Sequence, residues 1–162
     1  MALLLDERVR CEVILDGHHL DDEMVRMALS MKGTSGLMAV SDAMPLTGLG
    51  VSSGVFCGQE VCSDGSRATL SDGTLAGSVT LLPEALNRSG ERMGLGFPEL
   101  SNLGAATAAE DLGLPRRGLI RSDYRADLII EGESGIDAVL RGGVSVKDPD
   151  GPRLPREMER IQ

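Results

Sequence analysis

GLMAVSDAMPLTG, residues 36–48, is the stretch that decides the fold. It contains the apolar run LMAV, residues 37–40, which is typical of a short strand buried on both faces. The strand ends before Asp42, and the proline and glycine that follow prevent it from continuing. A carboxylate just after a buried parallel strand lies where α/β folds place catalytic groups, although Asp is also a favoured helix N-cap. Asp42 is therefore a candidate catalytic residue, and the alternative is a cap of the following turn or helix.

A second strand and a helix are predicted before this stretch. Residues 9–15, VRCEVIL, are typical of a strand, and the loop DGHH follows them. Residues 21–32 begin with acidic side chains and end before Gly33, as amphipathic helices do. The apolar face of this helix is expected to contain Met24, Met27, Ala28 and Met31. Strand, helix and strand then form one βαβ unit with a parallel pair and a right-handed crossover.

Titratable side chains follow both predicted strands. His18 and His19 come after the first strand, and Asp42 comes after the second. The carboxyl ends of neighbouring parallel strands meet at one edge of a sheet, about 4.8 Å apart. We therefore expect His19 and Asp42 to project into one cleft, whereas a lone histidine is usually an ordinary surface or core residue.

The middle of the chain changes character. Two short strands are predicted, VFCGQEV and SRATLSD, joined by a turn at Asp64 and Gly65. Residues 72–78, DGTLAGS, are predicted to form a small-residue loop that opens a helix over residues 79–87. Such a loop lets backbone groups approach a ligand closely, and the alternative is a plain connection. Further predicted elements are helices over 98–103 and 105–112, and strands over 117–121, 125–131, 138–141 and 144–147.

Composition excludes several classes of function. The chain has 162 residues, a net charge of −9 and 2% aromatic residues, which argues against a nucleic-acid partner. It has no apolar run long enough to span a membrane and no basic, apolar leader at MALLLDERVR. Three cysteines without metal-site spacing are typical of reduced thiols. We therefore expect a cytoplasmic protein without a membrane partner.

Taken together, these segments resemble the C-terminal part of the N-acetylglucosamine-6-phosphate deacetylases, a family of the amidohydrolase superfamily. The DGxH, SDA and DGTLAGS motifs form a specific combination, and the resemblance extends over residues 9–147. The matching segments, in the family's order, are ILDGHH (14–19), VSDAM (40–44), LSDGTLAGS (70–78), AEDLGL (109–114) and GLIRSDYRADLII (118–130).

The resemblance implies an α/β fold, in which a (β/α)8 barrel carries a small β-sandwich built from both ends of the chain. Residues 1–53 would be the last βαβ unit of the barrel, and residues 54–78 a β-hairpin and substrate loop. The remaining parts would be helices over 79–116, β-sandwich strands over 117–147 and a tail over 148–162.

The resemblance also implies an activity in amino-sugar catabolism. Enzymes of the family hydrolyse N-acetylglucosamine 6-phosphate to glucosamine 6-phosphate and acetate with a bound divalent metal, zinc or iron. Asp42 would be catalytic, taking a proton from the attacking water and delivering one to the leaving amine. His19 would contact the substrate and polarise its carbonyl, and the backbone of Leu75, Ala76 and Gly77 would line the sugar. The complete enzyme would be a homodimer.

The chain also departs from the family. A complete barrel of this type takes about 250 residues. The family's metal ligands precede the DGxH segment, whereas only His18 precedes His19 as a histidine here, so no metal ligand is predicted in this chain. We therefore expect the C-terminal half of a deacetylase: a truncated product, one with a misassigned start, or the partner of a separate N-terminal half. Such a half should associate through its exposed sheet edges.

Two other functions remain open at this point. One is an amidohydrolase with a different substrate, such as a cyclic amide, against which the DGTLAGS segment argues. The other is a non-catalytic remnant or interaction module, which the missing metal ligands favour. The intact His19, Asp42 and DGTLAGS favour descent from a working enzyme.

Overall fold

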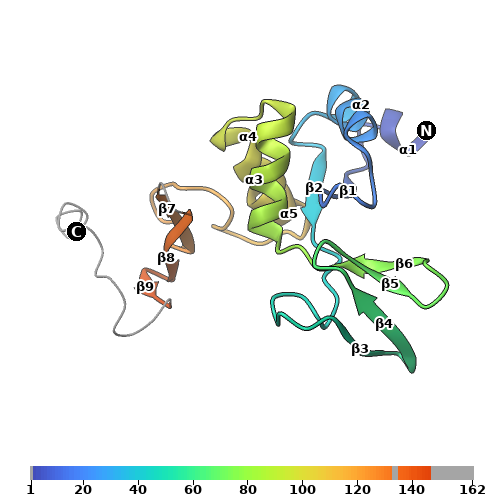
Figure 1. The fold of residues 1–162 in the computed structure, drawn as a ribbon. Coiled ribbons are helices and arrows are strands. Elements are labelled where there is room, and N and C mark those ends of the chain that lie inside the picture. Colours follow the sequence, from blue (N-terminus) through green and yellow to red (C-terminus); the bar gives the residue numbers. More distant parts are fainter. Residues whose placement is uncertain (1, 133–134, 147–162) are drawn as a thin grey trace.

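The structure, a computed structural model, describes residues 2–132 and 135–146 and has an α/β architecture. Within these residues a two-stranded, a four-stranded and a three-stranded sheet follow one another, with helices before and between them (Figure 1). The strands are β1 (Cys11–Ile14), β2 (Leu37–Val40), β3 (Ser53–Phe56), β4 (Gln59–Ser63), β5 (Arg67–Leu70), β6 (Leu75–Ser78), β7 (Leu128–Gly132), β8 (Gly135–Arg141) and β9 (Val144–Ser145). The helices are α1 (Ala2–Leu5), α2 (Asp22–Lys32), α3 (Leu82–Met93), α4 (Phe97–Ser101), the π-helical turn η1 (Asn102–Ala106) and α5 (Thr107–Asp111). Residue 147 of the last predicted strand and the predicted tail lie outside the described residues.

The predicted βαβ unit is confirmed. β1 and β2 pair in parallel, with Cys11 opposite Leu37, and α2 connects them. The side chain of Asp21 accepts a hydrogen bond from the Met24 N–H at the start of α2, and Gly33, with a φ of 63°, follows the end of the helix.

The apolar face of α2 is rotated relative to the prediction. Ala28 is buried as expected, but Met24 is 46% exposed and Val25 is buried instead. Helical periodicity permits both stripes, because Val25 and Ala28 are also three residues apart. The face of α2 that packs on the core therefore contains Val25, Ala28 and Leu29.

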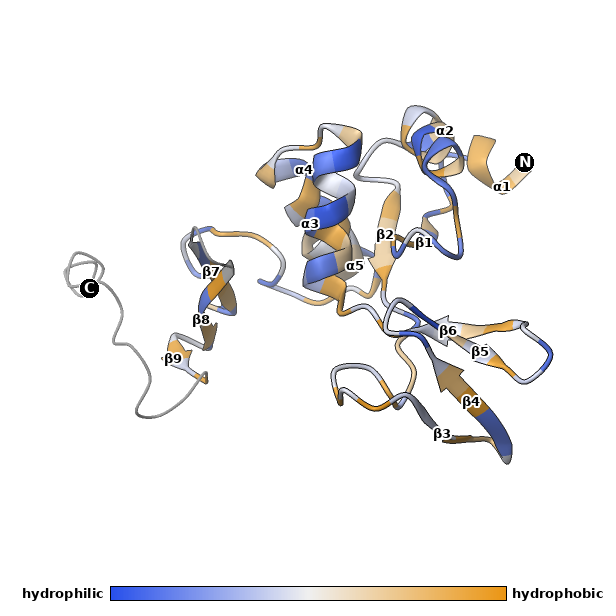
Figure 2. Ribbon diagram, in the orientation of Figure 1, coloured by the Kyte–Doolittle hydropathy of each residue, from blue (hydrophilic) through white to orange (hydrophobic). Residues whose placement is uncertain are grey.

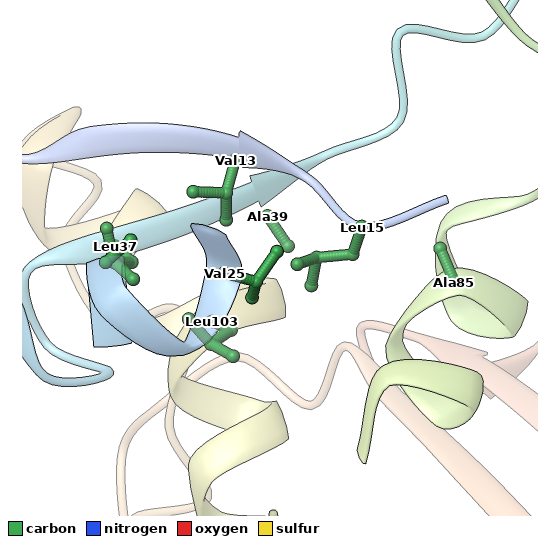
Figure 3. Close-up of a cluster of buried hydrophobic side chains, with 8 residues drawn as sticks. Val13, Leu15, Val25, Leu37, Ala39, Ala85 and Leu103 are labelled. Carbon is green, nitrogen blue, oxygen red and sulfur yellow. The ribbon is translucent and has the colours of Figure 1, made fainter. Parts of the chain in front are cut away.

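The main hydrophobic core surrounds β1 and β2. In β2, Leu37, Met38 and Ala39 are all buried, as the apolar run predicts. The helices α2 and α3 both contribute to this core and contact each other, with Arg92 Nε of α3 3.2 Å from Asp22 Oδ1 of α2. Figure 1 shows them beside β2, which is one of the most apolar segments of the chain (Figure 2). The buried cluster, shown in Figure 3, consists of Val13, Leu15, Val25, Ala28, Leu37, Ala39, Ala85 and Leu103.

Two predictions for the middle of the chain are wrong. VFCGQEV is not one strand, because Cys57 and Gly58 have φ values of 49° and 79° and form a tight turn between β3 and β4. The DGTLAGS segment is a loop only at residues 72–74, and Leu75–Ser78 is the strand β6, which pairs with β5. Hydrogen bonding to β5 outweighs the small-residue composition of this segment. The helix α3 consequently begins at Leu82 rather than at residue 79.

The prediction for the region after α3 is partly wrong. The two short helices predicted over 98–103 and 105–112 are one continuous helical segment, since α4, η1 and α5 follow one another without a break. No strand forms over residues 117–121, where Gly118 has a φ of 78° and packs closely against Ala106. The strand predicted over 125–131 begins only at Leu128.

Candidate functional site

The loop after β1 is folded around the carboxylate of Asp16. Its Oδ1 accepts hydrogen bonds from the backbone N–H groups of His18, at 2.9 Å, and His19, at 3.1 Å. Its Oδ2 lies 2.8 Å from Nδ1 of the His19 ring. The backbone contacts form an Asx-type turn, and the same carboxylate also contacts the His19 ring. Asp16 therefore orients both the backbone and the ring of His19.

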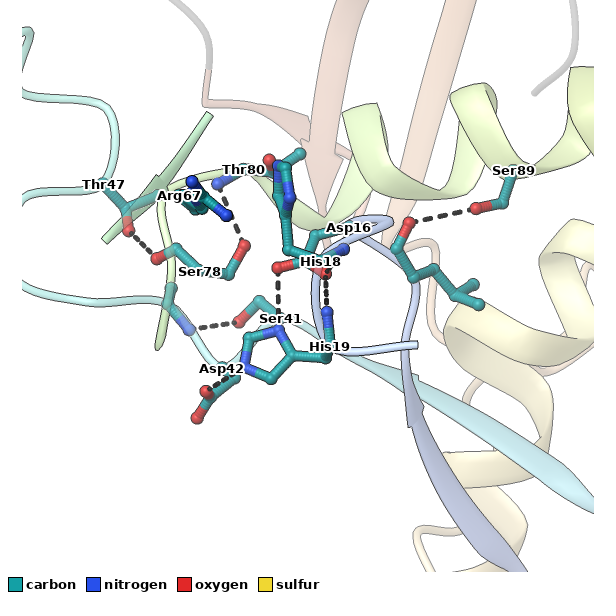
Figure 4. Close-up of polar contacts among 12 residues, drawn as sticks. Asp16, His18, His19, Ser41, Asp42, Thr47, Arg67, Ser78, Thr80 and Ser89 are labelled. Carbon is teal, nitrogen blue, oxygen red and sulfur yellow. Dashed lines mark hydrogen bonds and ion pairs between the residues drawn. The ribbon is translucent and has the colours of Figure 1, made fainter. Parts of the chain in front are cut away.

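Asp42 approaches the same ring from the end of β2. Its Oδ2 lies 3.1 Å from His19 Nε2, so the ring stands between two carboxylates (Figure 4). The side chain of His19 is 19% exposed and that of Asp42 is 51% exposed, so the pair opens to solvent. The structure thus brings His19 and Asp42 together at the matching ends of adjacent parallel strands.

Asp16 is held ionised although it is buried. Burial alone would raise the pKa of this carboxyl. The hydrogen bonds from the backbones of His18 and His19, from the His19 ring and from the hydroxyl of Ser78 together outweigh burial, and the pKa lies below its usual range. Ser78 is fully buried, and its Oγ also accepts a hydrogen bond from the Thr80 N–H at 3.1 Å.

The end of β6 packs directly against the segment that carries Asp42. Ser78 and Ala43 form a parallel bridge, in which the Ser78 N–H donates to the Asp42 carbonyl at 2.8 Å. Gly77, next to it, has a φ of 151°. A Cβ at this position would lie 2.7 Å from Met44 Cγ and 3.0 Å from the Asp42 carbonyl oxygen. Only glycine permits this close approach without rearrangement.

The other two predicted substrate-lining residues lie further back in β6. Leu75 pairs with Thr69 of β5. The side chain of Ala76 packs against a second apolar cluster that contains Met44, Val61 and Ala68. Of these three residues, Gly77 is the one next to Ser78, whose N–H donates to the Asp42 carbonyl.

The described residues do not supply a metal site. Across residues 2–132 and 135–146, no group of three or more His, Cys, Asp or Glu side chains is arranged to hold an ion. A catalytic zinc usually takes three protein ligands. In addition, both ring nitrogens of His19 face carboxylates, so neither is free to bind an ion in this arrangement.

Two members of the site did not emerge from the sequence as candidates. Asp16 carries a recognisable signal, because an Asp followed by a glycine at a strand end is typical of an Asx turn. Ser78 carries none, since its contact with Asp16 exists only when β6 packs beside the end of β1.

An apolar hollow lies elsewhere, between the helices and the last sheet. It has a volume of about 260 Å³, and its walls come from α3, α4, η1 and the β7–β8 hairpin. Neither His19 nor Asp42 lines it.

None of the helices that the structure describes is long and apolar enough to cross a membrane.

Comparison with curated proteins finds related deacetylases. The chain is 31% identical over 132 residues to the N-acetylglucosamine-6-phosphate deacetylase of Lysinibacillus sphaericus, covering 82% of this chain and 34% of the relative. It is 35% identical over 120 residues to that of Bacillus subtilis (strain 168), covering 74% and 30%. It is also 30% identical over 128 residues to an N-acetylgalactosamine-6-phosphate deacetylase of Shewanella sp. (strain ANA-3), covering 79% and 32%. The chain therefore spans about a third of the length of these relatives.

Solved structures give the same result. The N-acetylglucosamine-6-phosphate deacetylase of Thermotoga maritima superposes with a TM-score of 0.82 at 32% identity, over 89% of this chain and 40% of that one. A Mycobacterium smegmatis deacetylase variant, solved in complex with N-acetyl-D-glucosamine-6-phosphate, superposes with a TM-score of 0.81 at 26% identity, over 89% and 39%. No protein-family model matches the chain.

Proposed function

Since the chain is homologous to the N-acetylglucosamine-6-phosphate deacetylases over most of its length, we propose that it is the C-terminal portion of such an enzyme. In this proposal β1, α2 and β2 are the last βαβ unit of a (β/α)8 barrel, and the strands after α5 belong to a β-sandwich. The parallel pairing of β1 and β2 and the α2 crossover support the barrel assignment.

The proposed reaction is the hydrolysis of N-acetylglucosamine 6-phosphate. Water attacks the amide carbonyl, the C–N bond breaks, and acetate and glucosamine 6-phosphate leave. Asp42 takes the proton of the attacking water and returns a proton to the leaving amine. His19 contacts the substrate carbonyl, and the backbone of Leu75, Ala76 and Gly77 lines the sugar. The protein acts in the cytoplasm.

One observation carries this proposal. His19 Nε2 and Asp42 Oδ2 lie 3.1 Å apart at the carboxyl ends of adjacent parallel strands, which is where α/β barrels hold their catalytic side chains. Their partial exposure leaves room for a substrate to reach both groups.

The divalent metal of the complete enzyme, zinc or iron, would be held elsewhere. The described residues of this chain do not fit a three-ligand site. Its ligands would come from a preceding segment or from a separate N-terminal half, and the complete enzyme would be a homodimer.

The proposal is tested by acetate release from N-acetylglucosamine 6-phosphate with added Zn²⁺. The chain is assayed alone and also as a graft that replaces the corresponding part of the Thermotoga maritima enzyme. In the graft, Asp42→Asn should lower kcat by about 10²- to 10⁴-fold because an amide cannot take up the proton. Asp123→Asn is the matched control, since Asp123 is an exposed aspartate that also has a positive φ, 65° against 48° for Asp42.

An active graft whose kcat is unaffected by Asp42→Asn would contradict the role of Asp42. A well-folded graft with no activity at all would favour a non-catalytic module. Because one relative is an N-acetylgalactosamine-6-phosphate deacetylase, both sugar phosphates are assayed. A kcat/KM that favours the galacto epimer would reassign the substrate.

A further inference from the structure

Asp16 makes contacts that the proposed reaction does not use. Its two oxygens make different contacts. Oδ1 accepts hydrogen bonds from the backbone N–H groups of His18 and His19, and Oδ2 lies 2.8 Å from His19 Nδ1. The side chain of Asp16 is 1% exposed, so water does not compete for these contacts. The ring of His19 is therefore fixed by a buried group on one side and faces a half-exposed one, Asp42, on the other.

The hydrogen-bond chemistry of these groups determines where the ring protons lie. An ionised carboxylate only accepts hydrogen bonds, so the contact with Asp16 requires a proton on His19 Nδ1. In the neutral ring the other nitrogen, Nε2, then carries no proton. The contact between Nε2 and Asp42 becomes a hydrogen bond only when one further proton lies between them.

We propose that Asp16 is a positioning residue: by accepting the Nδ1–H of His19, it leaves Nε2 as the nitrogen that exchanges a proton with Asp42 and that, once protonated, donates a hydrogen bond to the substrate carbonyl. The role in proton exchange rests on the proposed function, whereas the tautomer of His19 does not. Ser78 supports the arrangement, because its buried hydroxyl gives Asp16 a further donor.

The substitution Asp16→Asn should reverse the tautomer of His19. The amide oxygen would keep the place of Oδ1, where two backbone N–H groups donate. The amide NH₂ would then replace Oδ2 and face His19 Nδ1 as a donor. Nδ1 must then accept this hydrogen bond and cannot carry a proton. The neutral tautomer should therefore change from Nδ1–H to Nε2–H.

Long-range ¹H–¹⁵N NMR of the histidine rings measures this directly. The chain has two histidines, so a His18→Gln variant leaves the signals of His19 alone. At a pH where the ring is neutral, the unsubstituted chain should show a protonated Nδ1 and a bare Nε2, and Asp16→Asn the reverse. Asp21→Asn is the matched control, since it makes the same chemical change at the exposed N-cap of α2 and should leave the tautomer unchanged.

An Nε2–H tautomer in the unsubstituted chain would overturn the proposal, and so would a folded Asp16→Asn variant that keeps Nδ1–H. If Asp16→Asn does not fold, the unsubstituted chain and Ser78→Ala, which retains the carboxylate, decide the question. Both should show Nδ1–H. None of these measurements needs enzymatic activity, so a failure of the proposed function would be seen separately.

The effect on catalysis is measured in the active graft. Asp16→Asn should lower kcat by about 10- to 100-fold, as loss of an orienting partner does, with little change in KM. It should also displace the pH profile of kcat, which a merely structural defect would not do. A graft in which Asp16→Asn leaves both kcat and the profile unchanged would show that Asp16 has no part in the reaction.

Discussion

The backbone N–H of Ser78 donates to the carbonyl of Asp42 at 2.8 Å, and the carbonyl of Ser78 accepts the Met44 N–H at 2.9 Å. This short parallel bridge joins the end of β6 to the turn after β2. Asp42 has a φ of 48°, a conformation that a residue other than glycine keeps only when its surroundings hold it. The position of the candidate catalytic carboxylate thus depends on the four-stranded sheet as well as on its own strand.

Gly77→Ala should therefore disturb both the fold and the site. The new Cβ would lie 2.7 Å from Met44 Cγ and 3.0 Å from the Asp42 carbonyl oxygen, at a φ of 151°. We expect the free energy of unfolding to fall by about 2–4 kcal/mol, from backbone strain and overpacking together. Urea denaturation followed by circular dichroism measures this.

Gly73→Ala separates the two causes. Gly73 has a φ of 86°, but a Cβ there would meet no atom within 4 Å. Its cost should be that of backbone strain alone, about 1–2 kcal/mol. An equal loss for both variants would show that the close approach at Gly77 is unimportant.

The carboxyl of Asp16 should make stability depend on acid pH. Its pKa is lower in the folded chain than the ordinary value of 3.8, since the hydrogen bonds to it outweigh burial. The contribution of Asp16 is therefore fully present above pH 3.8 and is lost as the pH falls through the folded pKa. We expect the difference in free energy of unfolding between the unsubstituted chain and Asp16→Asn to be constant near neutral pH and to shrink below about pH 4. A difference that stays constant or grows in acid would contradict this sign.

Ser89→Ala should loosen the contact between α3 and the end of β1. Ser89 is 1% exposed, and its Oγ donates to the Leu15 carbonyl at 3.0 Å. Removal of the hydroxyl leaves that carbonyl without this donor, so we expect a loss of about 1–2 kcal/mol in thermal or urea unfolding. Ser101→Ala, at an exposed position of α4, is the control and should change stability by less than about 0.5 kcal/mol. Equal effects at the two serines would rule out a specific role for the Ser89 bond.

The outer strand β3 should promote association. Among the residues that the structure describes, β3 pairs with β4 on one side only, and Val55 on it is 75% exposed. An unpaired edge with apolar side chains favours pairing with another chain. Sedimentation velocity should show association that rises with concentration and that Val55→Lys reduces.

Leu112→Lys is the control for this experiment. Leu112 is 70% exposed but lies at the end of α5, away from a strand edge. It adds the same charge, so a reduction equal to that of Val55→Lys would show a general charge effect. A chain that stays monomeric at all concentrations would exclude the edge as an association site.

Local patterns predicted part of this structure well. The apolar run of β2, the acidic start of α2 and the glycine after it are features of neighbouring residues, and the βαβ unit formed as expected. The prediction for β6 was wrong because small residues indicate a loop by composition, whereas β5 offers them hydrogen-bonding partners. The predicted strand over 117–121 was wrong for the opposite reason, since Gly118 packs against η1 instead of pairing with a strand.

The sequence by itself determined that His19 and Asp42 follow two adjacent parallel strands, because burial periodicity and helix capping act within a few residues. Only the tertiary structure decided what surrounds that pair. The backbone N–H groups of His18 and His19 and the His19 ring keep the pKa of the buried Asp16 low, and Ser78, more than sixty residues along the chain, adds a further donor. Gly77 lies against Asp42 because β6 happens to be the edge strand that meets the turn after β2. Such contacts depend on which strands pair across long loops, and no local pattern of residues encodes that choice.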